Sequence, residues 1–480
     1  MEGLRDADLF RQAALIGGDW VTAEGLAVTD PATGAVLGHV PALGAPAAEQ
    51  AIAVAEAAFA TWRRVPAEGR AAALLRWHDL MLDHADDLAL ILTGEQGKPL
   101  AEARGEILYG ASFVRWFAEE ARRLGGTVMD GPEPGRRILS LREPVGVCAV
   151  ITPWNFPNAM ITRKVAPALA AGCTVVVKPS DLTPFSALAL GVLAQRAGIP
   201  AGVINIVTGL PDGIGAALTA SPVVRKLSFT GSTRVGALLM AQCAPTVKRL
   251  SLELGGNAPF IVFDDADLDR TVDGIMASKF RNGGQTCVCA NRILVQDGVH
   301  DALAERLAAR VAVLRVGPGT AADVDIGPMI NAAAVDKIHR HVTDALSKGA
   351  RIAAQAAAPQ GPGWAAPMLL TGATPQMALA QEETFGPVAP LFRFATEAEA
   401  IDLANATPYG LASYFYTQDQ ARAWRVGAAL EFGMVGWNTG SVSTTVAPFG
   451  GVKQSGLGRE GGAEGIGEYL ETKAFHMMLE

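Results

Sequence analysis

The sequence predicts an α/β protein in which parallel sheets are covered by helices on both faces. Three observations indicate this fold class. Short runs of Val, Ile and Leu alternate with helical stretches over most of the chain, as in parallel sheets that are buried on both sides. Hydrophobic residues make up 50% of the 480 residues, enough to fill large cores. The length corresponds to about three domains of average size.

The first alternation runs from residue 145 to residue 232. Its apolar runs are VGVCAVI, TVVVKPS, GVINIVTG and KLSFTGS, and helical stretches lie near 158–171, 184–197, 212–220 and 233–243. Strands this apolar predict a parallel sheet. Because ligands bind beyond the carboxyl ends of such strands, we expect this part to be a nucleotide-binding domain.

A second alternation begins at APFIVFDD and predicts a second α/β unit. It continues through RILVQDG, VAPLFRF, ASYFYTQ and GMVGWNTG, with helical stretches near 266–280, 299–314, 396–406 and 418–430. The hairpin-like segment RRILSLREPVG and the tail after residue 460 fit neither unit. We expect these two segments to serve oligomerisation.

Charge and cysteine content argue against several functional classes. The formal net charge is −8 without any block of Lys or Arg, which argues against nucleic acid or an anionic membrane as partner. The longest uncharged apolar run, 166–177, is too short to span a bilayer. The amino terminus lacks the apolar stretch of a secretory signal, so a cytoplasmic location is expected. Five cysteines without a second ligand at metal spacing predict reduced thiols and no metal site.

Two of these cysteines lie in FRNGGQTCVCANR, residues 280–292. A glycine-rich turn between a helix ending near Phe280 and the strand RILVQ would place Cys287 at the apex of a loop. Backbone N–H groups there can point at whatever the sulfur attacks, which suits a nucleophilic thiol. A buried spectator cysteine is the alternative.

Four motifs, in this order, resemble the NAD(P)-dependent aldehyde dehydrogenase superfamily: PWNFP at 153–157, LELGGNAP, GQTCVCANR and ETFGPV at 383–388. Within it the chain is most similar to succinate-semialdehyde dehydrogenases. The resemblance implies a Rossmann-type cofactor domain (1–129 and 149–254), an α/β catalytic domain (255–445) and a small β oligomerisation element (130–148 and 446–480). It also implies a homotetramer or homodimer.

Three residues are predicted to be catalytic. The Cys287 thiolate would attack the aldehyde, and the Asn155 amide would join the Cys287 backbone N–H as an oxyanion hole, a contact worth about 3 kcal/mol. In RLSLELGG the leucines share one strand face, so Glu253 points the other way. The resemblance makes Glu253 the general base that activates water against the thioester. An Asx-turn role for Asn155 and a solvated carboxylate at 253 are the alternatives.

NAD is the predicted cofactor, and NADP is possible. The residues expected to bind it are Thr152, Trp154, Lys178, Ser180, Asp181, Gly231, Ser232, Glu383 and Phe385. Gly231 and Ser232 precede a helix and can offer backbone N–H groups to the pyrophosphate, or Ser232 can be a plain N-cap. Asp181 would accept hydrogen bonds from a ribose 2′-hydroxyl and repel a 2′-phosphate, which favours NAD.

The predicted substrate is an aldehyde with a carboxylate at its far end. Arg281 stands six residues before Cys287, and Arg163 follows PWNFP. Either guanidinium can hold a carboxylate bidentately or form an ordinary salt bridge. In semialdehyde dehydrogenases the matching arginines, with a serine matching Ser443, bind that group. Trp437 and SVSTTVAP depart from the commoner family patterns, so glutarate semialdehyde or another acidic aldehyde stands beside succinate semialdehyde.

Cys289 is a possible redox partner of Cys287. Cα atoms two residues apart lie roughly 5.5–7 Å from each other, near the disulfide range, so a reversible bridge is conceivable. A spectator thiol is an equal alternative. Two rival functions are a catalytically silent relative, which the presence of Cys287, Glu253 and Asn155 disfavours, and a thiol hydrolase, which would need a histidine near Cys287.

Overall fold

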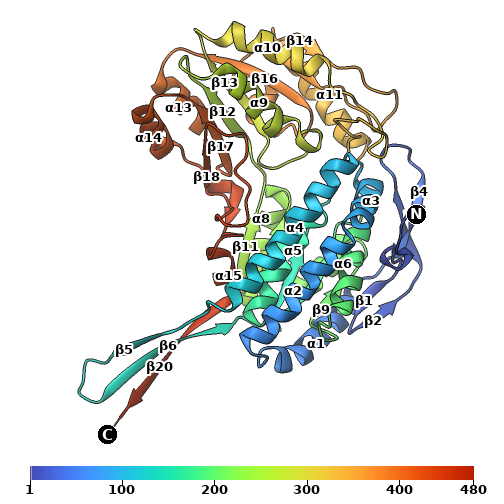
Figure 1. Cartoon of the computed structure of the whole chain (residues 1–480), viewed down its shortest axis with the longest axis vertical. Coiled ribbons are helices and arrows are strands. Elements are labelled where there is room, and N and C mark those ends of the chain that lie inside the picture. Colours follow the sequence, from blue (N-terminus) through green and yellow to red (C-terminus); the bar gives the residue numbers. More distant parts are fainter. Residues whose placement is uncertain (2, 480) are drawn as a thin grey trace.

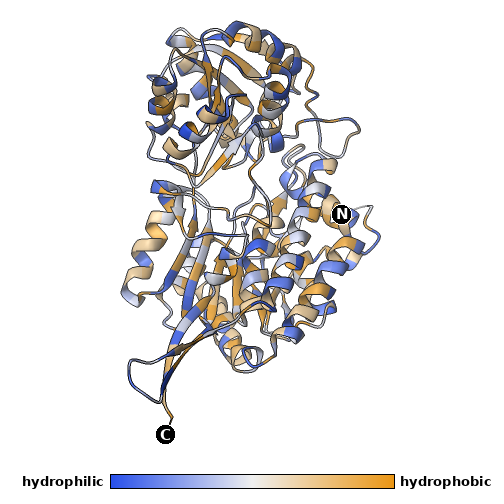
Figure 2. Cartoon of the chain, turned by 60° about the vertical axis from the view of Figure 1, so that its left-hand side comes forward, coloured by the Kyte–Doolittle hydropathy of each residue, from blue (hydrophilic) through white to orange (hydrophobic). Residues whose placement is uncertain are grey.

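The computed structural model describes residues 1 and 3–479. Figure 1 shows two α/β bodies one above the other, with a narrow β arm that extends from the lower body and ends near the C-terminus. In Figure 2 the strands of the upper body are mostly hydrophobic, whereas its helices alternate between hydrophilic and hydrophobic segments. Both bodies therefore bury their sheets beneath amphipathic helices, as the alternation of strands and helices predicts.

The lower body is built on an eight-stranded sheet in the order β19-β11-β10-β7-β8-β9-β1-β2. Its five central strands run parallel, β19 and β1 pair antiparallel with the two ends of this block, and β2 pairs antiparallel with β1. All four strands of the first alternation are present. The strands are β1 (Ala14–Ile16), β2 (Asp19–Val21), β7 (Val147–Ile151), β8 (Thr174–Lys178), β9 (Ile204–Ile206), β10 (Val224–Thr230), β11 (Arg249–Glu253) and β19 (Gly456–Leu457).

Alternate residues of the central strands face different helix layers. Cys148 and Val150 of β7 belong to the core completed by α2 to α6, whereas Val147 and Ala149 face α1, α7 and α8. The helices are α1 (Ala45–Trp62), α2 (Ala67–Asp83), α3 (Ala85–Gln96), α4 (Leu100–Ala121), α5 (Ala159–Ala171), α6 (Phe185–Arg196), α7 (Pro211–Ala220) and α8 (Thr233–Cys243). The four helices predicted in this region correspond to α5 to α8.

The order of the strands creates a switch point beside β7. The chain runs outward from β7 through β8 to β9, then crosses back to form β10 and β11 on the other side of β7. Parallel α/β sheets bind ligands beyond the carboxyl ends of the strands at such a point. Asn155 follows β7 and Ser232 follows β10, so both lie beyond the strand ends at this switch point, in the space called the crevice below.

The upper body contains a seven-stranded sheet in the order β14-β15-β16-β13-β12-β17-β18, parallel except for β14. Its strands are β12 (Ala258–Val262), β13 (Ala290–Gln296), β14 (Arg351–Gln355), β15 (Met368–Ala373), β16 (Val388–Phe394), β17 (Ala412–Tyr416) and β18 (Met434–Trp437). Its helices are α9 (Leu268–Lys279), α10 (His300–Ala312), α11 (Ala332–Ser347), α12 (Ala378–Gln381), α13 (Glu397–Asn405) and α14 (Gln420–Ala429). The five strands and four helices predicted in the second alternation are among these.

The arm consists of three antiparallel strands, β5 (Thr127–Asp130), β6 (Arg136–Pro144) and β20 (Leu470–Met478). It differs in extent from the predicted segments 130–148 and 446–480. Residues 456–457 form β19, which pairs with β11 in the first sheet, and α15 (Glu464–Gly467) packs against α5. Only the last part of the tail therefore lies in the arm.

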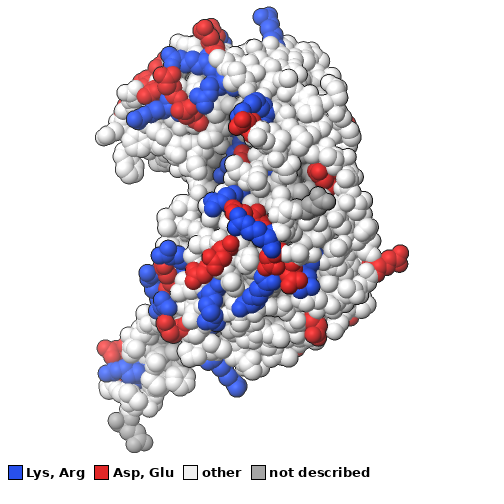
Figure 3. All heavy atoms as spheres, turned by 45° about the vertical axis from the view of Figure 1, so that its right-hand side comes forward, with Lys and Arg blue, Asp and Glu red and all other residues white. Residues whose placement is uncertain are grey.

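The remaining elements are short. A hairpin joins β3 (Gly25–Thr29) to β4 (Val36–Pro41), and four 3₁₀ segments are η1 (Ala7–Leu9), η2 (Ala244–Thr246), η3 (Arg281–Gly284) and η4 (Lys453–Ser455). No helix in the described part of the chain is long and apolar enough to cross a membrane. On the face seen in Figure 3, acidic and basic side chains are intermixed.

Candidate active site

A cavity of about 410 Å³ lies between the two bodies. The lower body contributes the ends of β7 and β10, and the upper body contributes the loop before β13, helix α11 and residues 383–385. Most predicted site residues meet here. Those lining the cavity are Trp154, Asn155, Arg163, Gly231, Ser232, Arg281, Cys287, Glu383, Phe385 and Ser443.

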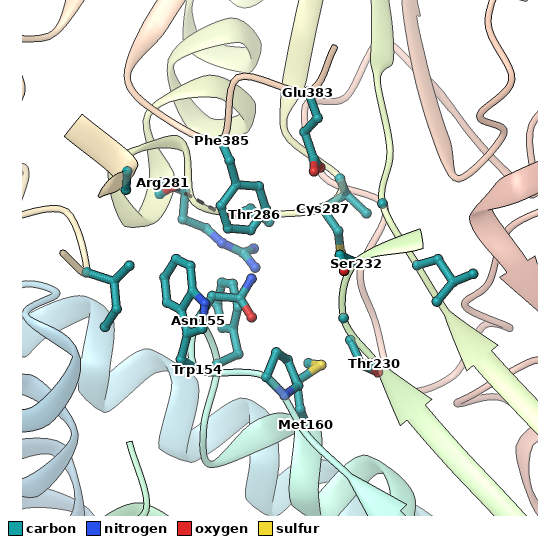
Figure 4. Close-up of a pocket in the computed structure, with 18 of the residues that line it drawn as sticks. Trp154, Asn155, Met160, Thr230, Ser232, Arg281, Thr286, Cys287, Glu383 and Phe385 are labelled. Atoms are coloured by element: carbon teal, nitrogen blue, oxygen red, sulfur yellow. Dashed lines mark hydrogen bonds between the residues drawn. The ribbon is translucent and has the colours of Figure 1, made fainter. Parts of the chain in front are cut away.

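Cys287 lies in a turn between η3 and β13, as the glycine-rich sequence predicts. The turn is closed by a hydrogen bond from the Cys289 N–H to the Thr286 carbonyl, 3.0 Å long. Before it, Asn282 and Gly283 adopt left-handed backbone angles, with φ of 51° and 61°. This reversal of the backbone directs the Cys287 side chain into the cavity (Figure 4).

The environment of the Cys287 thiol is less activating than the sequence suggested. Burial raises its pKa to about 12, and the carboxylates of Glu383 and Glu253 act in the same direction. Arg163 and Arg281 lower the pKa, but by less than burial raises it. Burial therefore favours the neutral form of this thiol over the thiolate.

Asn155 faces Cys287 across the cavity (Figure 4). Its side-chain Nδ2 donates a hydrogen bond of 2.9 Å to the Gln285 carbonyl, so it is tied to the loop that carries the cysteine. An amide nitrogen has two N–H groups. The second has no acceptor among the described residues.

Glu253 ends β11, and its neighbouring leucines pack on the opposite face of the strand, as predicted. The carboxylate does not line the cavity. The residue is only 2% exposed and neither oxygen has a hydrogen-bond partner in the described part of the chain, which excludes the solvated alternative. Burial, followed by the charge of Glu460, raises its pKa well above the ordinary value. In this conformation the Glu253 carboxylate stays outside the cavity that Cys287 lines.

The sequence missed a buried ion-pair cluster beside this carboxylate. Glu460 accepts hydrogen bonds from both Arg163 and Lys164, which are adjacent on α5. The Lys164 ammonium also donates to the Thr230 hydroxyl at 2.6 Å. Glu460 lies 296 residues from Lys164 in the chain, so no local pattern could have revealed the pairing.

The two arginines predicted to bind substrate are not equivalent. Arg163 is 2% exposed, paired with Glu460 and stacked 4.0 Å from the Phe449 ring. Arg281 lies 5.0 Å from the Phe156 ring and makes no salt bridge within the described residues, and Figure 4 shows its guanidinium pointing into the cavity. Of these two arginines, Arg281 is thus the one that remains available for an anion.

Two further polar groups in the cavity wall escaped the sequence analysis. The Tyr109 hydroxyl of α4 is buried there without a partner in the described part of the chain. Lys337 of α11 lines the cavity near Glu383. Its positive charge opposes the rise that burial causes in the pKa of Glu383. Neither residue stands in a recognisable motif, and only the packing of α4 and α11 brings them to the site.

Trp154, Phe385 and Glu383 surround one side of the cavity. The Trp154 and Phe385 rings meet edge to face with centroids 5.6 Å apart. The Glu383 carboxylate accepts a hydrogen bond of 3.3 Å from the Gly256 N–H, and burial raises its pKa to about 7. These three side chains form a wall that consists of two aromatic rings and one titratable carboxyl group.

Four predicted cofactor residues lie at the ends of β7 and β8, outside the cavity. The Thr152 hydroxyl is buried without a partner among the described residues. Lys178 donates to the Pro179 carbonyl at 2.9 Å and lies 3.8 Å from the Asp181 carboxylate. The Ser180 hydroxyl accepts from the Leu182 N–H at 3.2 Å. Thr152 thus lies at the switch point, and the other three follow the neighbouring strand β8.

The structure corrects one part of the anion-site prediction. The Gly231 N–H donates to the Glu253 carbonyl at 3.0 Å and is not free for a pyrophosphate. The Ser232 hydroxyl accepts from the Val235 N–H at 3.4 Å, so Ser232 is the N-cap of α8, the alternative left open by the sequence. The N–H groups of Thr233 and Arg234, in the first turn of α8, are then the nearest candidate anion donors.

Trp437 and Cys289 both point away from the cavity. The Trp437 indole N–H donates to the Thr417 carbonyl at 3.0 Å, and the residue does not line the cavity, so it cannot reshape the site directly. Cys289 is buried with its sulfur 3.4 Å from the Lys279 ammonium. All five cysteines are free thiols, and the redox partnership of Cys289 with Cys287 stays a prediction. No group of three potential metal ligands occurs among the described residues.

The aldehyde dehydrogenase family model matches residues 20–475. The chain belongs to the aldehyde dehydrogenase family. This confirms the family membership and enzyme class predicted from the four motifs. The predicted fold is confirmed as well, because the structure superposes on an aldehyde dehydrogenase from Brucella melitensis biovar abortus with a TM-score of 0.99, at 59% identity and complete coverage of both chains.

Relatives of this aldehyde dehydrogenase differ in the aldehyde they are named for. A glutarate-semialdehyde dehydrogenase of Pseudomonas putida and an NADP-dependent succinate-semialdehyde dehydrogenase of Escherichia coli are each 56% identical to it, and each match covers 98% of both chains. A 3-sulfolactaldehyde dehydrogenase of Pseudomonas putida is 58% identical with the same coverage. A succinate-semialdehyde dehydrogenase structure from Burkholderia pseudomallei matches at 58% identity and a TM-score of 0.98, covering 99% of this chain and 100% of that chain.

Proposed function

We propose that this aldehyde dehydrogenase oxidises succinate semialdehyde to succinate with reduction of NAD(P), and that glutarate semialdehyde or a related acidic aldehyde is the alternative. The observation that supports this most is the cavity itself. It holds a thiol, an amide donor and an unpaired guanidinium in one space. A catalytically silent protein would have no need of this combination.

In the first step, the Cys287 sulfur attacks the aldehyde carbon. Its proton leaves to water, so the Glu253 carboxylate stays free for the hydrolysis step, for which it rotates into the cavity. The carbonyl oxygen becomes an oxyanion that receives hydrogen bonds from Asn155 Nδ2 and the Cys287 N–H. Donors already fixed in place stabilise such a charge without reorganisation. The hydrogen bond to Gln285 fixes the Asn155 amide in this way.

In the second step, the substrate carbon loses hydride and a thioester forms on Cys287. When bound, the nicotinamide of NAD(P) accepts that hydride. Glu253 then removes a proton from water, which attacks the thioester carbonyl and releases the acid and the thiol. The raised pKa of Glu253 makes its carboxylate form a stronger base than a solvent-exposed glutamate.

The crevice fits a dinucleotide. The unpartnered Thr152 hydroxyl and the first turn of α8 offer polar groups at the switch point, while Trp154, Glu383 and Phe385 form a wall beside Cys287. We assign Lys178, Ser180 and Asp181 to the adenosine ribose. The Asp181 carboxylate favours NAD, because a 2′-phosphate would meet a like charge.

The substrate class follows from Arg281. Its unpaired guanidinium can bind a carboxylate with two parallel hydrogen bonds, and Ser443 can add one more. Arg163 also lines the cavity, but its charge is compensated by Glu460, so it adds shape and less charge to the site. Succinate, glutarate and sulfolactate aldehydes, for which relatives are named, all carry an anionic group away from the aldehyde.

We further propose that the protein works in the cytoplasm as a homotetramer or homodimer. Val128 and Phe475 both align with Leu139 across the arm sheet, and they are 73% and 50% exposed. Such an apolar ridge on a projecting sheet is typical of an interface.

The test of this function is a panel of aldehydes assayed with NAD and with NADP by absorbance of the reduced nicotinamide. Succinate and glutarate semialdehydes should give kcat/KM values at least about 10-fold above those for butanal and pentanal, which lack the carboxylate. Equal values for charged and uncharged aldehydes of the same length would contradict the substrate class. No turnover of any aldehyde would support the silent alternative.

A further inference from the structure

Lys98 lies in the three-residue link between α3 and α4, and its backbone is fixed. Gly97 ends α3 with a left-handed φ of 93°, and an added Cβ there would lie 2.6 Å from Cγ of Pro328. The Lys98 N–H donates to Gln96 Oε1 at 3.0 Å, and Pro99 leads into α4. The residue is only 2% exposed. Its side chain therefore extends into the protein instead of toward water.

The buried ammonium of Lys98 has three partners. It donates to Glu106 Oε2 at 2.6 Å and to the Asn155 carbonyl at 2.8 Å, and it lies 3.9 Å from the centroid of the Phe156 ring. A buried cation is tolerated when it is paired with an anion and its other protons find acceptors. Glu106 provides the charge. The second acceptor is the backbone of the residue that faces Cys287.

Asn155 is consequently held at both ends. Its carbonyl receives the Lys98 ammonium and, at 3.0 Å, the side-chain amide of Asn282. Its own amide donates to the Gln285 carbonyl at 2.9 Å. Asn282 is anchored in turn, because its N–H donates to the Glu102 carboxylate at 2.9 Å. These contacts fix the direction in which the second amide N–H of Asn155 points.

We propose that Lys98 is a positioning residue for the oxyanion hole: its ammonium holds the Asn155 carbonyl so that the Asn155 amide faces the oxygen of the Cys287 adduct. The inference rests on the role proposed for Asn155. Its physical basis is that a displacement of about 1 Å at a reacting centre costs about 100-fold in rate, and that a charged donor holds a carbonyl more strongly than a neutral one.

A purely structural role makes a different prediction. The other oxygen of Glu106 accepts hydrogen bonds from the N–H groups of Asn158 and Ala159 at the start of α5. On this alternative, the sole role of Lys98 and Glu106 would be to join α4 to α5. Loss of such a joint would reduce stability and activity to the same extent whether or not residue 155 carries an amide.

A double-mutant cycle separates the two roles. The variants are Lys98→Met, Asn155→Ala and their combination, assayed for the single-turnover rate of NADH formation, KM for the aldehyde and Kd for NAD. Lys98→Met is expected to lower the rate about 10- to 100-fold with KM and Kd unchanged. In the Asn155→Ala background the same substitution should change the rate less than about threefold, because the group that Lys98 positions is absent.

The matched control is Lys226→Met. Lys226 is fully buried in the same body and donates to Ser251, with Glu468 3.5 Å away. Its loss should leave the rate within about twofold of the wild type. If Lys98→Met lowers the single-turnover rate by the same factor in the wild-type and the Asn155→Ala backgrounds, the inference is overturned. An Asn155→Ala variant that turns over normally overturns the proposed oxyanion hole instead.

If Lys98→Met does not fold, Glu106→Gln provides the second measurement. Burial already lowers the pKa of Lys98, while Glu106 and Glu102 raise it and Arg281 lowers it. Without the Glu106 charge the pKa falls further, so the ammonium becomes neutral as pH rises and its hold on Asn155 weakens. The rate is expected to fall at high pH relative to wild type. A profile parallel to the wild type, or the same fall in the Asn155→Ala background, overturns the inference.

Discussion

At the scale of single residues, burial favours the neutral form of the proposed nucleophile, and its proposed partners already lie in the cavity wall. Burial raises the pKa of Cys287 to about 12, whereas Asn155 and Arg281 already face the cavity. A resting enzyme of this kind protects its sulfur from oxidants and alkylating agents, because the thiolate is the reactive form. Reactivity then depends on a base or on bound ligands.

The neutral state of the Cys287 thiol predicts how the rate of its alkylation depends on pH. Below the pKa of a thiol, the thiolate fraction rises tenfold with each pH unit. The rate at which iodoacetamide labels Cys287 in the cofactor-free enzyme should therefore rise about tenfold per unit between pH 7 and pH 9.5, without levelling. The rate is followed by mass spectrometry of the peptide that contains residue 287, with Cys287→Ala as the blank. A plateau below pH 9 would show that the thiol is already activated.

The unpaired guanidinium predicts a substrate-dependent loss in Arg281→Ala. For succinate semialdehyde, kcat/KM should fall about 10- to 100-fold, equivalent to about 1.5–3 kcal/mol for a charged hydrogen bond. For butanal it should be nearly unchanged. Arg270→Ala is the control, since Arg270 lies on α9 with its side chain 82% exposed. Equal losses for both aldehydes would assign Arg281 to folding or loop structure.

Local patterns account for the placement of Cys287 and Asn155 in the cavity wall, whereas Glu383, Phe385 and Ser443 were predicted only through the family resemblance. The turn that presents Cys287 is encoded by its own glycines, and the position of Asn155 follows from the strand before it. Glu460 pairs with α5 from across nearly 300 residues, and Lys98 reaches Asn155 from a separate helix link. The Gly231 N–H was wrongly predicted to be free for a pyrophosphate, because its acceptor, the Glu253 carbonyl, lies on a neighbouring strand that local sequence does not reveal.

At the scale of elements, the site is assembled where strands end. The ends of β7, β8 and β10 converge on the crevice, and the loops after them carry Asn155, Asp181 and Ser232. The strands and helices that alternate along the chain were predicted because each forms from a local pattern. The covering by α1 to α4 and the pairing of β19 with β11 depend on long-range contacts, so the sequence did not place them.

The loop after β8 predicts the cofactor preference. Asp181 lies 3.8 Å from the Lys178 ammonium, and its charge opposes a 2′-phosphate. Asp181→Ser should raise the ratio of kcat/KM for NADP to that for NAD by about 10-fold or more. Asp212→Ser is the control, because Asp212 is an exposed residue in the first turn of α7. An unchanged ratio in Asp181→Ser would remove this residue from cofactor selection.

At the scale of the whole molecule, two bodies enclose the chemistry and an arm extends away from them (Figure 1). The cavity has walls from both bodies, so catalysis depends on their relative placement. The arm takes no part in the cavity. Its exposed apolar ridge supports the separate role in assembly that we propose for it.

Replacing two side chains of this ridge should dissociate the enzyme. In the double variant Val128→Asp, Phe475→Asp, two charges would have to be buried in the proposed interface, at a cost of several kcal/mol. Light scattering should then report a smaller particle with unchanged helical content. Val313→Asp is the control, because Val313 is 70% exposed at the end of α10, in the other body. A particle of wild-type mass would contradict the role of the arm.

The central claim, that oxidation proceeds through a covalent adduct on Cys287 and hydrolysis by Glu253, is tested most directly in Glu253→Gln. The variant is mixed with succinate semialdehyde and NAD, quenched in acid and digested for mass spectrometry. The expected result is one burst equivalent of NADH per chain and a succinyl group on the peptide that contains Cys287. Sustained turnover without an adduct, or an acyl group on any other residue, would contradict the account.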